Sequence, residues 1–415
     1  MYAGSIPTLA SIQTRHAAGL DGRGAQKTKK MTPSTIVTRL FAQADVGLDG
    51  RREWDIQVHD PRFYRQVLRG SLGLGESYMD GYWDCADLPA LFCRLLEARL
   101  HKSALVKTAR WLLDVESRLT NMQTRRRAMA VAEEHYNLDH RLYELFLGPW
   151  NQYTCCFFDG TDDLAEAEVI KLEMICNKLD IQADDNVLDI GSGWGGFARY
   201  AASTRGCQVT GISLSTEQNA YARNYTAGLP VEIVQADYRD LPSIRAAGSF
   251  DKVLICGMIE HVGYKNYRSI MDIVHTMLSD DGLFLLHTLG NDQTTTIGDP
   301  WMERYIFRNS MMPAMPQLAE AAQGLFAIHD WENYGHYYAR TVQAWNDNFQ
   351  RNWERIRAIE TDKPFDERFR RMFNYYFMSC KGAFLSESIY LWHLVMSKRG
   401  QRRSVYPRVN LMTSS

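Results

Sequence analysis

The sequence predicts an α/β protein with a doubly wound, Rossmann-like sheet and a smaller, mainly helical N-terminal domain. Short β-type runs alternate with helical runs in the middle of the chain, which is typical of a parallel sheet. A glycine-rich turn follows the first of these runs, and the residues before them have helical spacing. With 415 residues, of which 45% are hydrophobic, the chain is long enough to form two domains.

The N-terminal part is expected to contain two regions. Residues 1–33 are rich in small and polar residues without an apolar period, so we expect a mobile tail. Residues 34–130 are expected to form a helical lipid-binding or membrane-binding domain, interrupted by glycine-rich turns at 70–81. The helical spacing is carried by apolar residues such as Phe63, Val67, Leu88, Leu91 and Phe92.

Residues 131–415 are expected to form the sheet domain, with a pocket for its substrate. Leu164–Leu179 has the apolar face of a helix, and strand-like runs follow it. From Phe307 to the end the pattern predicts helices that contain several aromatic residues. The expected strands are Asn186–Ile190, Gln208–Ser213, Val231–Gln235, Lys252–Cys256 and Gly282–His287.

Charge and cysteine usage limit the function classes. A formal net charge of -2 argues against nucleic-acid binding as a general activity. Eight cysteines without a CxxC pair or metal-like Cys/His spacing indicate a reducing cytoplasm and predict no metal site. No apolar run approaches the roughly 20 residues that a membrane-spanning helix needs. Any membrane contact is therefore expected at the surface.

Two basic segments are candidates for that contact. Between Arg99 and Arg127 there are eight Lys or Arg residues and two acidic residues, interleaved with leucines and Trp111. This pattern suits an anionic lipid surface. A second basic cluster extends from Lys398 to Arg408. The alternative, a solvated charged helix and tail, is equally compatible with the sequence.

The segment NVLDIGSGWGG, Asn186–Gly196, predicts a cofactor loop. Its glycines let the backbone approach a ligand closely and adopt positive φ. The acid before the first glycine departs from the dinucleotide fingerprint GxGxxG. The loop resembles the first motif of class I S-adenosylmethionine-dependent methyltransferases. That resemblance places Asp189 near the cofactor's ammonium group, and Gly191 and Gly193 beside its carboxylate and ribose; a purely structural turn is the alternative.

Two further segments are expected to complete the cofactor site. GISLSTEQ (211–218) lacks the acid that most class I enzymes place on the ribose, so Ser213 and Gln218 are expected to supply hydrogen bonds there, with Leu214 between them. Asp237 offers an acceptor for an adenine amino group, and Tyr238 a ring beside it. A turn aspartate and a core tyrosine remain the alternatives.

Beyond this loop, the sequence resembles the cyclopropane-fatty-acyl-phospholipid synthases from about Trp54 to Ser397. GLGESYMDG resembles the N-terminal domain of the full-length bacterial members. The other segments are EEHYNL (133–138), QYTCCFF (152–158), GMIEHVGYKNY (257–267), LHTLG (286–290), DPWMERYIFRN (299–309), DWENYGHYYARTVQAW (330–345) and SKRG (397–400).

The resemblance implies methylene transfer from S-adenosylmethionine to the cis double bond of an unsaturated acyl chain in a membrane phospholipid. It implies a carbocation that a bound bicarbonate ion deprotonates, because methyl transfer to an alkene leaves a proton to be lost. The ion would be held by Glu260, His287 and Tyr338 and by backbone groups of Cys155 and Leu289. Tyr153 and Thr154 would lie beside the sulfonium.

Each ion ligand has a structural alternative when it is taken alone. Glu260 can cap a turn, His287 can be a core histidine, and Tyr338 can serve packing. Because Tyr337 is adjacent, which tyrosine contacts the ion stays open. The sequence departs from the family pattern at other positions: Ser192 replaces a cysteine, Cys156 an alanine and Phe157-Phe158 a Tyr-Trp pair.

The resemblance also implies a homodimer that is cytoplasmic and peripherally attached to the inner face of the cell membrane, with unsaturated phospholipids as partners. Two rival functions remain open. One is a relative that makes methyl-branched lipids or N-methylates an amine, as plant benzylisoquinoline N-methyltransferases do. The other is a non-catalytic lipid-binding homologue.

Overall fold

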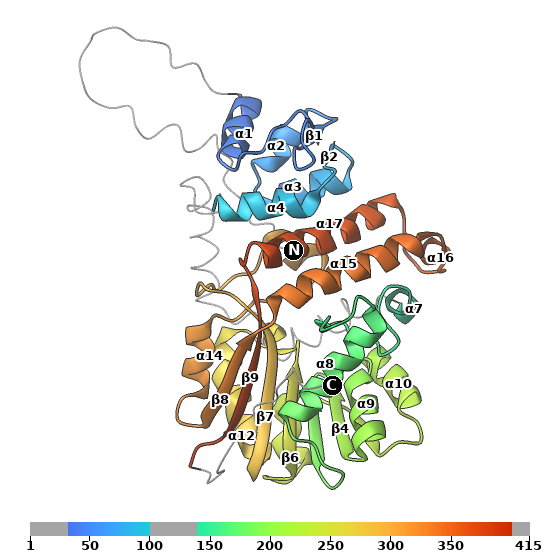
Figure 1. The fold of residues 1–415 in the computed structure, drawn as a ribbon, viewed down its shortest axis with the longest axis vertical. Helices are drawn as coiled ribbons and strands as arrows, with labels where there is room; N and C mark the ends of the chain where they lie inside the picture. The colour runs from blue at the N-terminus through green and yellow to red at the C-terminus, as the bar shows by residue number, and fades with distance from the viewer. Residues whose placement is uncertain (1–31, 100–138, 401–415) are drawn as a thin grey trace, which may run out of the picture.

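A computed structural model describes residues 32–99 and 139–400. Its centre is a seven-stranded sheet with the order β5-β4-β3-β6-β7-β9-β8. Helices cover both faces of this sheet, and a smaller group of N-terminal elements lies at one end of the molecule (Figure 1). The α/β class and the doubly wound sheet are therefore confirmed.

The parallel part of the sheet contains the five strands that the sequence predicts. These five strands pair with one another in parallel. The last two begin earlier than expected, and the final one also extends further. Most of their residues are buried, as expected of parallel strands covered on both faces. The strands are β3 (Asn186–Ile190), β4 (Gln208–Ser213), β5 (Val231–Gln235), β6 (Phe250–Cys256) and β7 (Leu278–Gly290).

Helices pack on the two faces through separate apolar clusters. On one face, α8 (Leu164–Lys178) and α9 (Gly196–Arg205) pack against the sheet. On the other, α12 (Tyr267–Met277) and α14 (Met315–Ala322) do so. Other helical elements of this part are α7 (His140–Glu144), α10 (Thr216–Tyr225), η3 (Tyr238–Asp240), α11 (Leu241–Ile244), η4 (Ile259–His261), η5 (Tyr264–Asn266) and α13 (Pro300–Tyr305).

The all-helical prediction for the region after Phe307 is wrong in part. This region contributes two strands, β8 (Phe326–Asn333) and β9 (Tyr390–Lys398), and β9 lies antiparallel between β7 and β8. Seven consecutive residues of β9 are buried. A strand buried on both faces shows no alternation, so its sequence pattern does not distinguish it from a buried helix.

Three helices of this region, all of them after α14, lie between the sheet and the N-terminal elements (Figure 1). They are α15 (Gly335–Arg351), α16 (Trp353–Arg357) and α17 (Glu367–Leu385). The first begins directly after β8, and the last ends five residues before β9 begins. Because both helices adjoin strands of the sheet, they connect the sheet to the N-terminal elements.

The N-terminal elements include two short paired strands among their helices. The turns expected at 70–81 are wrong, because most of that segment is helix α3. Its glycines permit close packing: a Cβ at Gly73 would lie 1.8 Å from the carbonyl oxygen of Gln66. The elements are α1 (Pro33–Ala42), β1 (Gln57–Val58), α2 (Phe63–Val67), α3 (Ser71–Met79), β2 (Trp83–Asp84) and α4 (Leu88–Glu97).

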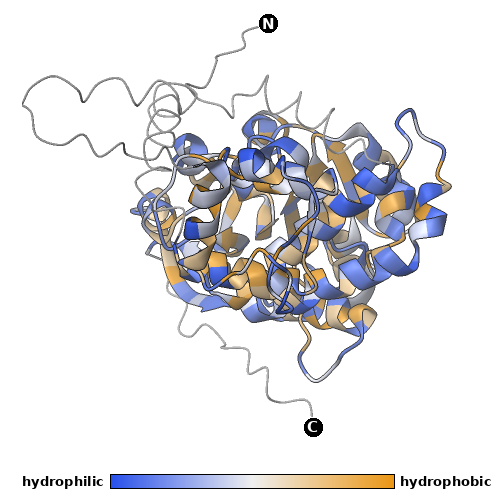
Figure 2. Cartoon of the chain, turned by 90° about the horizontal axis from the view of Figure 1, so that it is seen from above, coloured by the Kyte–Doolittle hydropathy of each residue, from blue (hydrophilic) through white to orange (hydrophobic). Residues whose placement is uncertain are grey.

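The N-terminal elements share one apolar core with α15 and α17. Phe92 of α4 meets Tyr375 of α17 edge-to-face, with ring centroids 5.1 Å apart. Arg371 donates hydrogen bonds to the carbonyl oxygens of Tyr78 and Trp83, at 2.6 and 2.9 Å. Figure 2 shows apolar residues concentrated in the interior and polar residues on the outward helices.

Within the described ranges, no helix is long and apolar enough to cross a membrane. All eight cysteines lie in these ranges and are free thiols. The basic segment between Arg99 and Arg127 lies outside the described residues except for Arg99. Of the second basic cluster, only Lys398 and Arg399 are described.

Candidate active site

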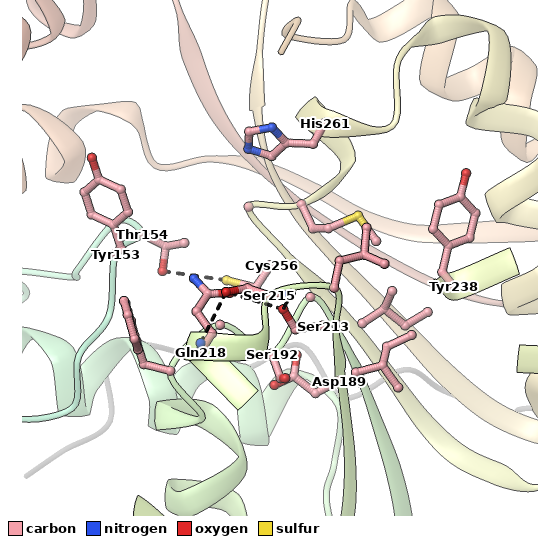
Figure 3. Close-up of a pocket in the computed structure, with 18 of the residues that line it drawn as sticks. Tyr153, Thr154, Asp189, Ser192, Ser213, Ser215, Gln218, Tyr238, Cys256 and His261 are labelled. Carbon is pink, nitrogen blue, oxygen red and sulfur yellow. Dashed lines mark hydrogen bonds between the residues drawn. The ribbon is translucent and has the colours of Figure 1, made fainter. Parts of the chain in front are cut away.

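A cavity of about 220 Å³ lies at the carboxyl ends of β3, β4, β5 and β6. This is where open α/β sheets bind their ligands. Figure 3 shows Tyr153 and Tyr238 on opposite sides of the view, with Asp189 and Ser213 between them. All of the predicted cofactor-binding residues line the cavity: Tyr153, Thr154, Asp189, Gly191, Gly193, Ser213, Leu214, Gln218, Asp237 and Tyr238.

The glycine loop forms one wall of the cavity. Gly191 has a φ of 87°, and Gly193 has a φ of 51°. A Cβ at Gly191 would lie 2.7 Å from the Cβ of Met258, which also lines the cavity. The amides of Gly191 and Ser192 donate to the carbonyl oxygen of Ile212, at 2.9 and 3.0 Å. The loop is therefore fixed to the end of β4 in a shape that needs glycine.

Asp189 carries a buried carboxylate at the base of the loop. Its relative exposure is 2%. Burial raises the pKa of Asp189 to about 7, although the positive charge of Lys171 lowers it in part. A desolvated carboxylate of this kind is stabilised in its ionised form by a cationic ligand. The ammonium group of an amino-acid cofactor supplies such a charge.

Two buried charges that the sequence reasoning missed hold the segment QYTC in place. Lys171 is fully buried, and its Nζ donates to Gln152 Oε1 and to Thr154 Oγ1, the latter at 3.0 Å. Glu168 accepts from the amides of Trp150 and Gln152, at 2.9 and 3.1 Å. Burial raises the pKa of Glu168 to about 7. In the sequence, both charges lie in an ordinary helical pattern that gives no sign of burial.

The end of β4 presents a connected set of hydroxyl and amide groups. Ser213 Oγ donates to Gln218 Oε1 and accepts from the amide of Ser215, both at 3.2 Å. Ser215 caps the N-terminus of α10 by accepting from the amide of Gln218. Asn219 Nδ2 donates to the Ser213 carbonyl oxygen at 3.0 Å. Sequence reasoning missed Ser215 and Asn219, although serine before a helix is a recognisable cap signal.

Asp237 and Tyr238 lie at the end of β5. The Asp237 carboxylate accepts from the amide and the guanidinium of Arg239, at 2.9 and 2.8 Å. That guanidinium lies 4.6 Å from the centroid of the Tyr238 ring. Asp237 therefore has a protein partner already, and its role as an adenine acceptor stays a prediction.

The second group of predicted residues lies next to the cavity but does not line it. Glu260 comes from η4 and has a relative exposure of 6%. Its Oε1 accepts from the Leu289 amide at 2.7 Å and from Thr288 Oγ1 at 3.0 Å. Its Oε2 is buried, and no hydrogen-bond partner for it exists among the described residues. Burial raises the pKa of Glu260.

His287 lies on β7, two residues before Leu289, and is 1% exposed. Its Nδ1 lies 2.7 Å from Nε2 of His393 on β9. Burial lowers the pKa of His287 well below its ordinary range, and the charges of Lys171 and Lys178 lower it further. His287 is therefore neutral in the folded protein. Sequence reasoning missed His393, which is 106 residues away along the chain.

Tyr338, Cys155 and Leu289 meet in one apolar cluster. The Tyr338 ring stacks on Phe384, with centroids 4.6 Å apart. Tyr337 belongs to the same cluster, so the choice between the two tyrosines stays open. Burial raises the pKa of the Cys155 thiol far above its usual value, which makes it a poor nucleophile.

The two groups of residues are adjacent. Thr154 lines the cavity, and Cys155 follows it; His261 lines the cavity, and Glu260 precedes it. The amide of Gly257, another lining residue, donates to the His287 carbonyl oxygen at 2.9 Å. The arrangement therefore places a preformed cavity next to a desolvated set of polar groups.

Comparison with known proteins assigns the family. The family model of mycolic acid cyclopropane synthetase matches residues 123–394. The cyclopropane-fatty-acyl-phospholipid synthase of Escherichia coli strain K12 is 40% identical over 364 residues, which cover 88% of this chain and 93% of that protein. This chain belongs to the cyclopropane synthase family. The predicted class, an S-adenosylmethionine-dependent cyclopropane-fatty-acyl-phospholipid synthase, is confirmed by that membership.

Solved structures support the fold. Mycolic acid cyclopropane synthase CmaA1, complexed with SAH and CTAB, matches with a TM-score of 0.57 at 24% identity, over 65% of this chain and 98% of that one. Coclaurine N-methyltransferase, bound to N-methylheliamine and SAH, matches with a TM-score of 0.64 at 21% identity, over 78% and 99%. Both likenesses confirm the class I methyltransferase fold of this synthase.

Proposed function

We propose that this synthase transfers a methylene group from S-adenosylmethionine to the cis double bond of an unsaturated acyl chain in a membrane phospholipid, with bound bicarbonate as the base. Family membership supports the reaction class. The single observation that supports the ion is Glu260 Oε2, a buried oxygen without a hydrogen-bond partner among the described residues, beside the cofactor cavity.

The cofactor fits the residues of the cavity. Asp189 would bind the ammonium group, and the open backbone at Gly191 and Gly193 would leave room for the carboxylate and ribose. Ser213 and Gln218 offer hydroxyl and amide groups to the sugar. The sulfonium supplies an electrophilic methyl group, so an alkene can attack it without an activated nucleophile.

The second group of residues fits a small protonated anion. Glu260 Oε2 would accept the O–H of the ion, because its other oxygen is already fixed by Leu289 and Thr288. His287 and the hydroxyl of Tyr338 would donate to the remaining oxygens. Bicarbonate bound here supplies a base that accepts the proton lost when the cyclopropane ring closes.

The aromatic surroundings suit a transient cation. The Tyr153 ring lies 5.3 Å from the rings of both Tyr143 and Trp345, and 6.2 Å from Phe307. Aromatic faces attract positive charge, more strongly where water is excluded. The burial of Glu260, His287 and Cys155 keeps water away from a carbocation that it would otherwise capture.

The partner predictions extend beyond the described residues. We propose that the enzyme is a homodimer that binds the cytoplasmic face of an anionic membrane peripherally through the basic segment between Arg99 and Arg127. Replacing Arg125–Arg127 with glutamine should reduce binding to vesicles that contain anionic phospholipid. Unchanged binding in a sedimentation assay would contradict the membrane role.

Glu260→Gln tests the ion. The variant should lose turnover by at least about a hundredfold, since it removes the acceptor for the ion's O–H, while keeping its calorimetric affinity for S-adenosylmethionine. In wild type, removing dissolved carbon dioxide should slow the reaction, and added bicarbonate should restore it. Glu320→Gln, at an exposed position on α14, is the control and should behave as wild type.

Lipid mass spectrometry identifies the product. Vesicles of unsaturated phospholipid should gain one CH₂ unit for each modified double bond. A gain of a methyl branch with reduction of the double bond would indicate the rival lipid methyltransferase. A fully active Glu260→Gln variant would contradict the ion site.

A further inference from the structure

A second histidine lies against His287. In the antiparallel pair of β7 and β9, His287 is directly opposite His393. Nδ1 of His287 lies 2.7 Å from Nε2 of His393. The two residues are 1% and 0% exposed, so water does not satisfy these nitrogens. A proton must therefore lie between the two rings, on one nitrogen or the other.

Both rings are neutral. Burial lowers the pKa of each well below the ordinary range, and the ammonium groups of Lys171 and Lys178 lower both further. A neutral imidazole has one N–H and one bare nitrogen. The contact therefore has two possible arrangements: His393 donates from Nε2 to His287, or His287 donates from Nδ1 to His393.

The surroundings of His393 distinguish these arrangements. Its Nδ1 is buried and has no hydrogen-bond partner among the described residues. If His287 donated, Nε2 of His393 would be the acceptor and the proton of His393 would lie on Nδ1. This buried N–H would have no acceptor, and buried N–H groups without an acceptor are rare in folded proteins. If His393 donates, its Nδ1 is bare.

We propose that His393 is a positioning residue that donates its Nε2–H to His287 and thereby keeps the proton of His287 on Nε2. The hydrogen bond at one ring nitrogen sets the protonation of the other. The inference rests on the proposed function in one respect: an Nε2–H on His287 is the donor that an anion beside Glu260 requires. The opposite tautomer would present a lone pair to that anion and repel it.

Long-range ¹H–¹⁵N correlation spectra of the full-length protein labelled at histidine test the tautomer without lipid or bicarbonate. His287→Gln assigns the His287 signals. We expect wild-type His287 to show the Nε2–H pattern, and His393→Phe to shift it toward a mixture of tautomers. The Nδ1–H pattern in wild type, or an unchanged tautomer in His393→Phe, would overturn the proposal.

Kinetics separate positioning from packing. His393→Phe should lower kcat by about ten- to a hundredfold, as losses of orienting partners do, with KM for S-adenosylmethionine unchanged. His393→Gln keeps an amide N–H toward His287, so it should recover most of the kcat and the Nε2–H pattern. A folded His393→Gln variant as slow as His393→Phe would overturn the proposal. His275→Phe, on α12, is the histidine control and should leave both measurements as in wild type.

Failure of the ion proposal has a different signature. If Glu260→Gln were fully active, or if the reaction rate did not depend on bicarbonate, the proposal of a bound anion would be wrong. The tautomer shift between wild type and His393→Phe would persist in that case, because it depends only on the contact between β7 and β9.

Discussion

The two glycine-rich segments of this synthase have similar compositions and different structures. In α3, Gly73 and Gly75 have helical backbones, and their missing side chains let Gln66 and Trp301 approach closely. In the cofactor loop, Gly191 and Gly193 have positive φ and border the cavity. Glycine thus permits close packing between elements in one segment, and a positive-φ backbone beside the cavity in the other.

Each segment also has one buried acid, and the two acids differ in their partners. Glu76 of α3 accepts from Arg69 at 2.8 Å and from the Tyr305 hydroxyl at 3.0 Å. Asp189 has its charge only partly compensated, by Lys171, and the pKa of its carboxyl is raised. Glu76 is thus satisfied within the protein, whereas Asp189 retains a charge that the proposed cofactor would compensate.

Asp189→Asn should have the largest effect and should separate binding from stability. Cofactor affinity should fall by more than about a hundredfold, since breaking a buried charge pair costs about 3–5 kcal/mol. The cofactor-free variant should melt at a higher temperature than wild type, because ionised Asp189 destabilises the folded state. The stability difference between the variant and wild type should grow as the pH rises from 3.8, the ordinary pKa of an aspartate, to about 7, the pKa of Asp189 in the folded protein. Above that pH the difference should stay constant.

Calorimetric titration and thermal melts between these pH values check both effects. Glu76→Gln is the matched control and should lower stability while leaving cofactor affinity unchanged. A lower melting temperature for cofactor-free Asp189→Asn at neutral pH would contradict the contrast between the two acids.

Gly191→Ala should have the second-largest effect. An added Cβ would lie 2.7 Å from the Cβ of Met258 at a φ of 87°, so steric overlap and left-handed strain together should cost about 3 kcal/mol. If the loop moves to relieve this, cofactor affinity falls by about a hundredfold, as measured by calorimetry. Adding Met258→Gly, which removes the Cβ and Cγ that the new methyl group would meet, should recover the steric part only. Wild-type affinity in the single variant would show that the loop does not need glycine there.

Gly75→Ala should lower stability by about 2 kcal/mol through overpacking, because the new Cβ would lie 2.3 Å from the Trp301 indole. Alanine forms helix better than glycine by about 1 kcal/mol. A loss of stability in urea unfolding would therefore come from the contact with Trp301 and not from helix propensity. Combining the change with Trp301→Leu should give less than the sum of the two effects. A stabilised Gly75→Ala variant would contradict close packing at α3.

The smallest effect is expected for Gly81→Ala. Gly81 follows the end of α3 with a φ of 73°, and an added Cβ would meet nothing within 4 Å. Strain alone should therefore cost about 1 kcal/mol in the free energy of unfolding. Gly81→Asn should lose less, because asparagine tolerates this conformation. Equal losses for the two variants would point to a contact instead of strain.

The contrast also explains how far the sequence predicts the structure. The glycine-rich turn after β3 was predictable because an acid near the end of a buried strand precedes spaced glycines, and the residues predicted to bind the cofactor all line one cavity. The helix α3 was not predictable, because Gly73 and Gly75 are required by contacts with Gln66 and Trp301, and the local sequence does not show these contacts.

The second group of site residues depends on contacts between distant segments. The family resemblance proposed Glu260 and His287 as site residues, but it did not predict the residues that contact them. His393 lies on a strand whose buried run looks like helix, and Lys171 lies in an unremarkable helical pattern. His393 contacts His287 because of the register between β7 and β9, and Lys171 is buried because α8 packs against the sheet. A local sequence pattern predicts neither feature.

The strand order has a consequence for the sequence of events during synthesis. β8 hydrogen-bonds only to β9 within the described sheet, and β9 follows it in the chain by more than fifty residues. Until β9 emerges from the ribosome, β8 has no partner and β7 presents an open edge, which is prone to wrong pairing. His287 meets His393 in the same late step, so the polar groups beside the cavity are completed only once β9 has been synthesised.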